Sequence, residues 1–171
     1  MSNIVPIENI RQLWMTFGNA CNHRCVFCYQ TDFMKRLPEA VFPNIEKIYP
    51  TISACVLQGG EVTIMPHVQE FMRKVLSINQ NVKFDIVTNG QEFDESWQWL
   101  FASAGRAVHF SINAATRETY EKVTPGGDWN QVMNNLWSII TNKAGSHFPI
   151  VRTSMVVTDD NVHEIFLFAK T

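Results

Sequence analysis

The chain has 171 residues, enough for one domain with a hydrophobic core, and its 46% of hydrophobic residues is typical of a folded protein. A net charge of −2 argues against nucleic acid as a partner, because surfaces that bind nucleic acid are usually basic. No apolar run approaches the roughly 18 residues of a membrane helix and no signal peptide is evident, so we expect no membrane segment and a cytoplasmic location.

Patterns typical of strands and helices alternate along the chain. Short apolar or β-branched runs predict five strands, at residues 13–17, 54–57, 82–87, 108–112 and 150–157. We expect helices around residues 39–48, 68–76, 97–101, 128–140 and 161–170. This alternation predicts an α/β protein with a parallel sheet and right-handed crossovers. It leaves open whether the helices cover one face of a curved sheet or both faces of a flat one.

Polar segments, several of them containing glycine, follow the predicted strands. They comprise residues 18–28, 58–61, 88–91, 113–116 and 158–161. The carboxyl ends of parallel strands meet at one edge of a sheet, where α/β proteins bind their ligands. These segments are therefore expected to form the functional edge of the domain.

Three of the four cysteines lie close together, with Cys21, Cys25 and Cys28 in a C-x3-C-x2-C pattern. In a reducing compartment such spacing indicates a metal or redox site rather than disulfides. Three thiolates can bind three irons of a cubane cluster and leave the fourth iron open to a small molecule. A structural zinc ion, the alternative, needs four protein ligands, and His23 could be the fourth only in a cramped geometry. Cys55 lies in a predicted strand and is expected to be a core residue.

This cysteine motif, with an aromatic residue just before its last cysteine, resembles the signature of the radical S-adenosylmethionine (SAM) superfamily. Further segments that resemble this family follow in the same chain order: Gly59-Gly60-Glu61, Thr88-Asn89-Gly90, Ser111-Ile112-Asn113 and Val156-Val157-Thr158. The resemblance covers the chain from about residue 13 onward. It is closest to the branch that contains the SPASM-type maturases of peptides and proteins.

The resemblance implies a partial (βα) barrel of radical SAM type, with about five βα units present and the sixth missing. Residues 1–12 would be an N-terminal extension, and residues 13–171 a radical SAM core that is incomplete at its C-terminus and lacks the cysteines of a SPASM-type domain. The resemblance also implies a [4Fe-4S] cluster and SAM as cofactors. An external electron donor of the flavodoxin or ferredoxin type would be a partner.

The resemblance further assigns residues to these cofactors. Cys21, Cys25 and Cys28 would ligate the cluster, and the open iron would take the amino and carboxylate groups of SAM. The residues expected to contact or border SAM are Phe27, Gly59, Gly60, Glu61, Thr88, Asn89, Ser111, Asn113 and Arg152. Arg152 could pair with the SAM carboxylate, or it could be a surface charge or part of a structural ion pair.

The sequence departs from the family pattern at two positions. The common GGEP motif has Val62 in place of its proline, and the common SIDG motif ends in Asn113 and Ala114. Because an asparagine can still hydrogen-bond a hydroxyl group, SAM binding stays the expectation.

The activity implied by the resemblance is reductive cleavage of SAM to methionine and a 5′-deoxyadenosyl radical, which removes a hydrogen atom from a substrate. No side-chain acid or base is assigned to the cleavage. The leading hypothesis for the substrate is a peptide or protein side chain. The alternatives are a small-molecule or cofactor precursor as substrate, and a non-catalytic metal-binding module.

Overall fold

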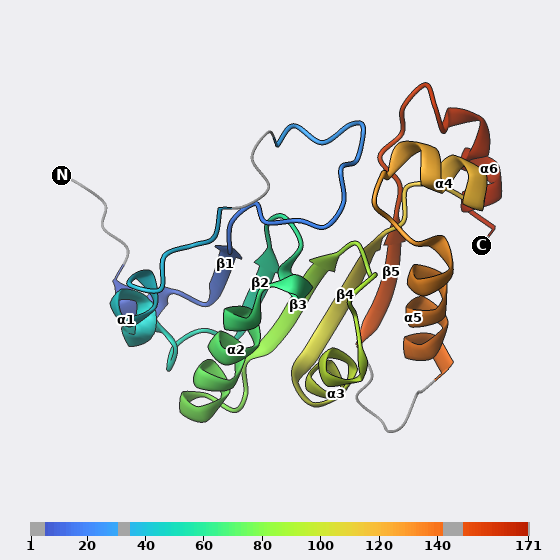
Figure 1. The fold of residues 1–171 in the computed structure, drawn as a ribbon. Coiled ribbons are helices and arrows are strands. Elements are labelled where there is room, and N and C mark those ends of the chain that lie inside the picture. Colours follow the sequence, from blue (N-terminus) through green and yellow to red (C-terminus); the bar gives the residue numbers. More distant parts are fainter. Residues whose placement is uncertain (1–5, 31–34, 142–148, 171) are drawn as a thin grey trace.

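The computed structural model describes residues 6–30, 35–141 and 149–170. In these ranges five parallel strands form one sheet with the order β1-β2-β3-β4-β5 (Figure 1). The strands are β1 (Gln12–Thr16), β2 (Ala54–Gln58), β3 (Lys83–Thr88), β4 (Gly105–Ser111) and β5 (Ile150–Ser154). The α-helices are α1 (Val41–Ile45), α2 (Pro66–Ile78), α3 (Glu95–Ala104), α4 (Arg117–Val123), α5 (Trp129–Thr141) and α6 (Ile165–Phe168). Within these ranges, no helix is long and apolar enough to cross a bilayer.

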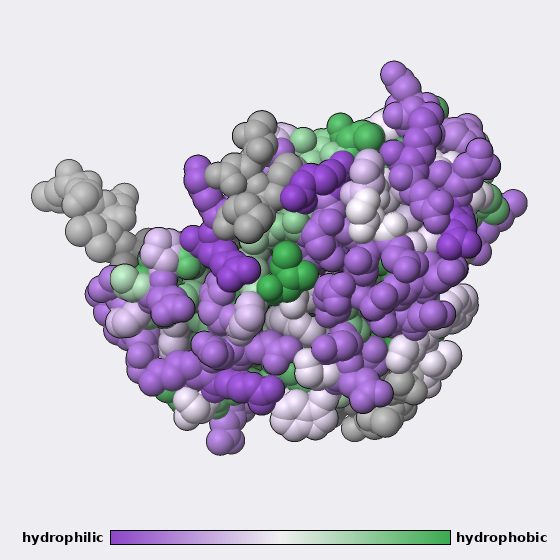
Figure 2. Space-filling model, in the orientation of Figure 1, coloured by the Kyte–Doolittle hydropathy of each residue, from purple (hydrophilic) through white to green (hydrophobic). Residues whose placement is uncertain are grey.

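The helices that connect the strands lie on one face of the sheet. Strands that pair in chain order through right-handed crossovers place every crossover on the same side. Figure 1 shows α2, α3 and α5 on that side, and Figure 2 shows that the surface there is largely hydrophilic. The predicted α/β class with a parallel sheet is confirmed. Of the two arrangements of helices that the sequence left open, the structure has the one with the connecting helices on a single face of the sheet.

The hydrophobic core lies between the sheet and these helices. Leu57 on β2, Ile86 on β3 and Phe110 on β4 are fully buried in it. The predicted apolar face of α2 is buried as well, through Val68, Phe71, Met72 and Val75. On the opposite face of the sheet, Trp14 is 62% exposed and Val87 is 38% exposed. This second face is therefore open in the described part of the chain.

Sequence patterns placed the strands correctly, but their ends differ by up to three residues. β4 begins at Gly105 rather than at residue 108, and β5 ends at Ser154 rather than at residue 157. α5 begins where the capping-box spacing predicts, because Asp128 Oδ1 accepts a hydrogen bond from the Gln131 backbone N–H at 3.1 Å.

α4 is a helix that the sequence did not predict, and a distant residue fixes its start. The Glu164 carboxylate accepts hydrogen bonds from the backbone N–H of Ala115 at 2.6 Å and of Thr116 at 3.2 Å. It also accepts hydrogen bonds from the hydroxyl groups of Thr116 and Thr119. Glu164 is only 4% exposed, and a negative charge at a helix N-terminus is favourable. This tertiary contact adds to a local N-cap, in which the Thr116 hydroxyl accepts a hydrogen bond from the Thr119 N–H at 3.3 Å.

The hydrogen bonds to the Glu164 carboxylate make the free energy of unfolding depend on pH. Burial acts to raise the pKa of Glu164, but the hydrogen bonds to its charged form outweigh burial and hold the pKa below its ordinary value. A carboxylate with a lowered pKa stabilises the fold above the ordinary pKa of about 4.3, and this contribution is lost as pH falls through the folded-state pKa. Glu164→Gln should therefore lower the free energy of unfolding by about 1–3 kcal/mol at pH 7. The loss should shrink below about pH 4.

Urea unfolding at a series of pH values measures this dependence. Glu121→Gln is the matched control, because Glu121 lies on the same helix with half of its side chain exposed, in an ion pair with Arg117. We expect that control to change stability by less than about 0.5 kcal/mol at every pH. A loss for Glu164→Gln that stays constant between neutral and acidic pH would contradict the assignment.

Candidate functional site

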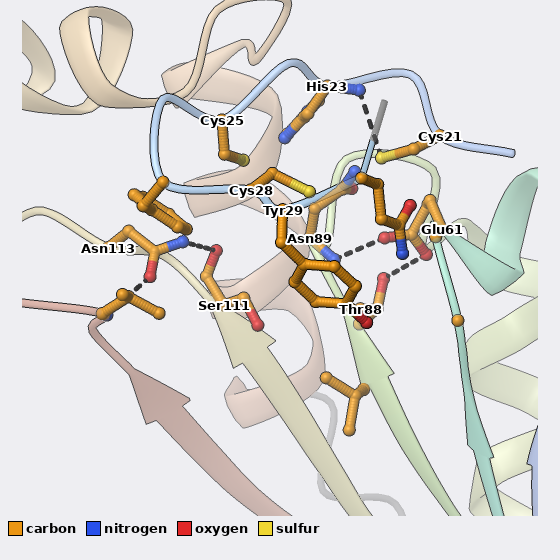
Figure 3. Close-up of a pocket in the computed structure, with 16 residues that line it drawn as sticks. Cys21, His23, Cys25, Cys28, Tyr29, Glu61, Thr88, Asn89, Ser111 and Asn113 are labelled. Carbon is orange, nitrogen blue, oxygen red and sulfur yellow. Dashed lines mark hydrogen bonds between the residues drawn. The ribbon is translucent and has the colours of Figure 1, made fainter. Parts of the chain in front are cut away.

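The cysteine loop, residues 18–30, leaves β1 and crosses the carboxyl ends of the strands (Figure 1). Cys21, Cys25 and Cys28 in this loop are free thiols, each partly buried. Figure 3 shows their sulfur atoms pointing into a common space. All three line one cavity of about 480 Å³, which is within the size range of small-molecule sites.

The cavity gathers segments from several strand ends, as the parallel topology predicts. The predicted site residues that line it are Cys21, Cys25, Phe27, Cys28, Gly59, Gly60, Glu61, Thr88, Asn89, Ser111 and Asn113. Arg152 is not among the lining residues. The cavity also has lining residues that the sequence analysis did not assign to the cofactors: His23, Tyr29, Gln30, Val87 and Val156. Three of them lie inside or directly after the cysteine motif, and the other two lie at the ends of predicted strands. These positions were the signal that could have identified them.

The thiols suit a cluster better than a single metal ion. Burial raises the pKa of Cys21 and Cys25, that of Cys25 to about 11, so the thiols stay protonated until a metal displaces the proton. Within the described ranges, no three His, Cys, Asp or Glu side chains lie close enough together to hold one metal ion. In an iron–sulfur cubane each thiolate binds a different iron, which needs wider spacing. Three thiols around one cavity therefore fit a [4Fe-4S] cluster.

The structure gives a steric reason why residues 59 and 60 are glycines, and this reason lies within the protein itself. Gly59 has a φ of +142°, and a Cβ atom on it would lie 2.6 Å from the Gly18 carbonyl oxygen. A Cβ atom on Gly60 would lie 2.2 Å from the Ala20 carbonyl oxygen. The Gly60 N–H donates to the Gly18 carbonyl at 2.9 Å, so the end of β2 docks directly on the start of the cysteine loop. The expected approach of SAM to these glycines stays a prediction.

Glu61 joins the ends of β2 and β3 through hydrogen bonds, and its expected place beside SAM stays a prediction. Its side chain accepts a hydrogen bond from the Thr63 backbone N–H at 3.0 Å. It also accepts hydrogen bonds from the Thr88 hydroxyl at 2.7 Å and the Asn89 backbone N–H at 2.5 Å (Figure 3). Burial raises the pKa of the Glu61 carboxyl, and these hydrogen bonds to its charged form oppose that rise. Asn89 Nδ2 then donates to Asn22 Oδ1 at 2.7 Å, which extends the connection to the cysteine loop.

Asn113 holds the ends of β4 and β5 together. Its φ is 63°, a left-handed conformation that asparagine tolerates better than most residues. Its Oδ1 accepts a hydrogen bond from the Val156 N–H at 2.8 Å, and its Nδ2 donates to the Ser111 carbonyl at 3.1 Å (Figure 3). The side chain thus has a structural role at the rim of the cavity, and its expected contact with SAM stays a prediction.

Arg152 lies on the open face of the sheet, where it pairs with His109. The two residues are register partners on β5 and β4, and Arg152 Nη1 lies 2.9 Å from His109 Nε2. Burial and the charge of Arg152 both lower the pKa of His109, so the neutral ring accepts this hydrogen bond. The structure thus shows Arg152 hydrogen-bonded to a neutral histidine rather than in an ion pair, and its expected contact with the SAM carboxylate stays a prediction.

The comparison with known proteins agrees with this arrangement. The family model described as the radical SAM superfamily matches residues 15–168. A GTP 3′,8-cyclase from Desulforamulus reducens is 22% identical in an alignment 171 positions long that covers 95% of this chain and 52% of that protein. A GTP 3′,8-cyclase from Pseudomonas fluorescens is 26% identical over 137 residues, which cover 75% of this chain and 41% of that protein. The chain spans about half the length of the first of these relatives and less of the second.

Solved structures show the same fold. The anSMEcpe structure with bound AdoMet has a TM-score of 0.74 at 17% identity, and the match covers 94% of this chain and 47% of that one. Streptococcus suis SuiB bound to the precursor peptide SuiA has a TM-score of 0.69 at 14% identity, covering 93% of this chain and 36% of that one. The predicted partial barrel of radical SAM type is thereby confirmed. Because the family model matches most of its length, the chain belongs to the radical SAM superfamily, whose members use a [4Fe-4S] cluster and SAM.

Proposed function

We propose that the chain is the SAM-cleaving core of an enzyme that acts on a peptide or protein side chain. The observation that carries this proposal is the single cavity of about 480 Å³, which brings the three thiols together with the ends of β2, β3 and β4. When bound, the cluster supplies the electron for reductive cleavage of SAM, and the resulting radical removes a hydrogen atom from the substrate. Radical SAM enzymes need an electron donor, so we expect a flavodoxin or ferredoxin as the partner.

The residues of this chain would bind and orient the cofactors. Cys21, Cys25 and Cys28 would hold the cluster, and the glycine pair at residues 59–60 would present backbone atoms to the amino acid part of SAM. Apolar side chains at the cavity, such as Phe27, would offer a surface to the adenine and limit access of water to the reacting atoms.

Two observations bear on the class of substrate. Among the solved structures of the same fold, SuiB is bound to a precursor peptide and anSMEcpe is bound to the Kp18Cys peptide, which supports a peptide substrate. The second candidate is a small molecule of the nucleotide class, and the similarity to GTP 3′,8-cyclases favours it. Both candidates use the same cavity for SAM.

Anaerobic SAM cleavage tests the proposed function. The protein is reconstituted with iron and sulfide, mixed with SAM and dithionite, and assayed for 5′-deoxyadenosine by mass spectrometry. We expect 5′-deoxyadenosine only when iron is loaded, because reduction of SAM requires the cluster. A fully loaded protein that forms no 5′-deoxyadenosine would disprove the proposal.

Isotope transfer then separates the two substrate classes. Hydrogen abstraction from a deuterated substrate places deuterium in the 5′-deoxyadenosine, so the label identifies the molecule that reacts. Deuterated GTP that transfers its label would favour the nucleotide candidate. Transfer from a deuterated peptide, with none from GTP, would support the peptide assignment.

A further inference from the structure

His23 is the most buried residue of the cysteine motif. Its exposed fraction is 2%, whereas the three cysteines are only partly buried and Val26 is 55% exposed. The sequence suggests His23 only as a fourth zinc ligand in a cramped geometry. A polar side chain that is buried to this degree needs hydrogen-bond partners, because an unpaired buried polar group costs stability.

One nitrogen of the His23 ring has a partner that fixes its protonation. His23 Nε2 lies 3.0 Å from Gln91 Oε1, and the Asp128 backbone N–H donates to the same oxygen at 2.8 Å. Because the Asp128 N–H can only donate, the Gln91 atom facing it must be the amide oxygen. Since that oxygen can only accept, the hydrogen of the neutral imidazole is on Nε2, and Nδ1 carries the lone pair.

The ring of His23 packs against that of Tyr120, which carries a group that complements the other nitrogen. His23 Nδ1 and the Tyr120 hydroxyl are both buried, and neither makes a hydrogen bond of normal geometry in the described part of the chain, although the Thr124 side chain interacts with the Tyr120 hydroxyl. The two rings meet edge to face, with their centroids 6.4 Å apart. Tyr120 is fully buried, and its phenol can donate the hydrogen bond that Nδ1 can accept.

We propose that His23 is a positioning residue for the cysteine loop, and that its Nδ1 accepts a hydrogen bond from the Tyr120 hydroxyl, directly or through one buried water. This bond joins Tyr120, His23, Gln91 and Asp128 into one chain of hydrogen bonds behind the cysteines. Its consequence for the cluster rests on the proposed function, whereas the hydrogen-bond chain itself does not.

Backbone contacts already hold the end of α4, which carries Tyr120, against the cysteine loop. The Arg24 N–H donates to the Pro125 carbonyl at 2.7 Å, and the Val26 N–H donates to the Val123 carbonyl at 3.0 Å. A side-chain bond from Tyr120 to His23 would therefore act within a segment whose backbone is fixed. It would restrict the part of the loop between Cys21 and Cys25, and so the geometry in which the thiolates meet the irons.

Release of iron to a chelator from the reconstituted protein tests this proposal. Loss of one hydrogen bond should speed release about three- to tenfold in Tyr120→Phe, and at least as much in His23→Leu, which also loses the bond to Gln91. If the two groups share one bond, the double variant should release iron no faster than His23→Leu alone. His23→Asn places an amide oxygen close to the position of Nδ1 but still lacks the bond to Gln91, so it should release iron more slowly than His23→Leu. Effects of the two single variants that multiply in the double variant would overturn the proposal.

A control and a spectroscopic readout separate positioning from general destabilisation. Tyr49→Phe is the matched control, since Tyr49 is equally buried but packs against Phe71, away from the cysteine loop. The electron paramagnetic resonance signal of the reduced cluster with SAM should change in Tyr120→Phe and in His23→Leu, but not in Tyr49→Phe. An unchanged signal in all three variants would count against a positioning role.

Failure of the proposed function would be seen separately. If the wild-type chain takes up no iron, the cluster assignment fails, and the hydrogen-bond chain is tested by urea unfolding of the same variants without metal. The effects of Tyr120→Phe and His23→Leu on the unfolding equilibrium should again be less than multiplicative. Independent effects in that measurement would overturn the hydrogen bond as well.

Discussion

The Cys25→Ala variant will hold no complete cluster and will form no 5′-deoxyadenosine from SAM. Cys25 is one of three thiols around the cavity, and a cubane that loses one of three protein ligands has two irons without one. We expect iron and sulfide content after anaerobic reconstitution to fall to the background of the unreconstituted protein. Visible absorbance from thiolate-to-iron charge transfer should be lost together with SAM cleavage.

Cys55→Ala is the matched control for this prediction. Cys55 is fully buried on β2 and packs in the hydrophobic core, as predicted from its apolar strand, so its thiol is remote from the cavity lining. Its replacement should leave iron content and SAM cleavage unchanged and lower stability by about 1 kcal/mol through lost packing. Wild-type iron content in Cys25→Ala, or equal loss of iron in the two variants, would contradict the assignment of the cysteine loop as the cluster site.

The features that the sequence predicted well depend on short-range patterns and one topological rule. Five apolar runs identify five strands, because each run is long enough to fill the core and is closed by polar residues. The rule that parallel strand ends converge then brings Thr88, Ser111 and the glycine pair of residues 59–60 to the cysteines, although up to 90 residues separate them. No alternative pairing of strands needed to be considered.

The features that the sequence did not predict depend on single long-range contacts. α4 has no marked apolar periodicity, and its start is fixed by Glu164, a residue 48 positions beyond Thr116. His23 is buried because Gln91, 68 positions away, accepts its hydrogen bond. The side chain of Asn113 is occupied by the backbone at Val156, 43 positions away. Each of these contacts forms only once the sheet has folded, so no local pattern encodes it.

At the glycine pair of residues 59–60, the sequence predicted the feature but not the contact that explains it. The sequence identified the pair from the resemblance to a family motif and explained it by a ligand that approaches the backbone. The structure shows that the carbonyl groups of Gly18 and Ala20 already occupy the space that side chains would need. In the described residues, the close approach that the two glycines allow is therefore to the cysteine loop itself, and the approach of SAM stays a prediction.

A second large effect follows from that contact. In Gly60→Ala the new methyl group would lie 2.2 Å from the Ala20 carbonyl oxygen, a backbone atom that cannot rotate away. The start of the cysteine loop must therefore shift, and Cys21, the next residue, shifts with it. We expect the variant to lose most of its iron after reconstitution and to be destabilised by about 1–3 kcal/mol, the usual cost of overpacking.

Gly105→Ala separates displacement of the loop from simple loss of stability. A Cβ atom on Gly105 would lie 2.5 Å from the Phe101 carbonyl oxygen, so the clash is again with backbone, but at the opposite end of the sheet from the cysteine loop. Urea unfolding should show comparable destabilisation in the two variants, whereas iron content should fall only in Gly60→Ala. If both variants keep their iron, or both lose it in proportion to their stability, the contact between residues 60 and 20 does not set the position of the cysteines.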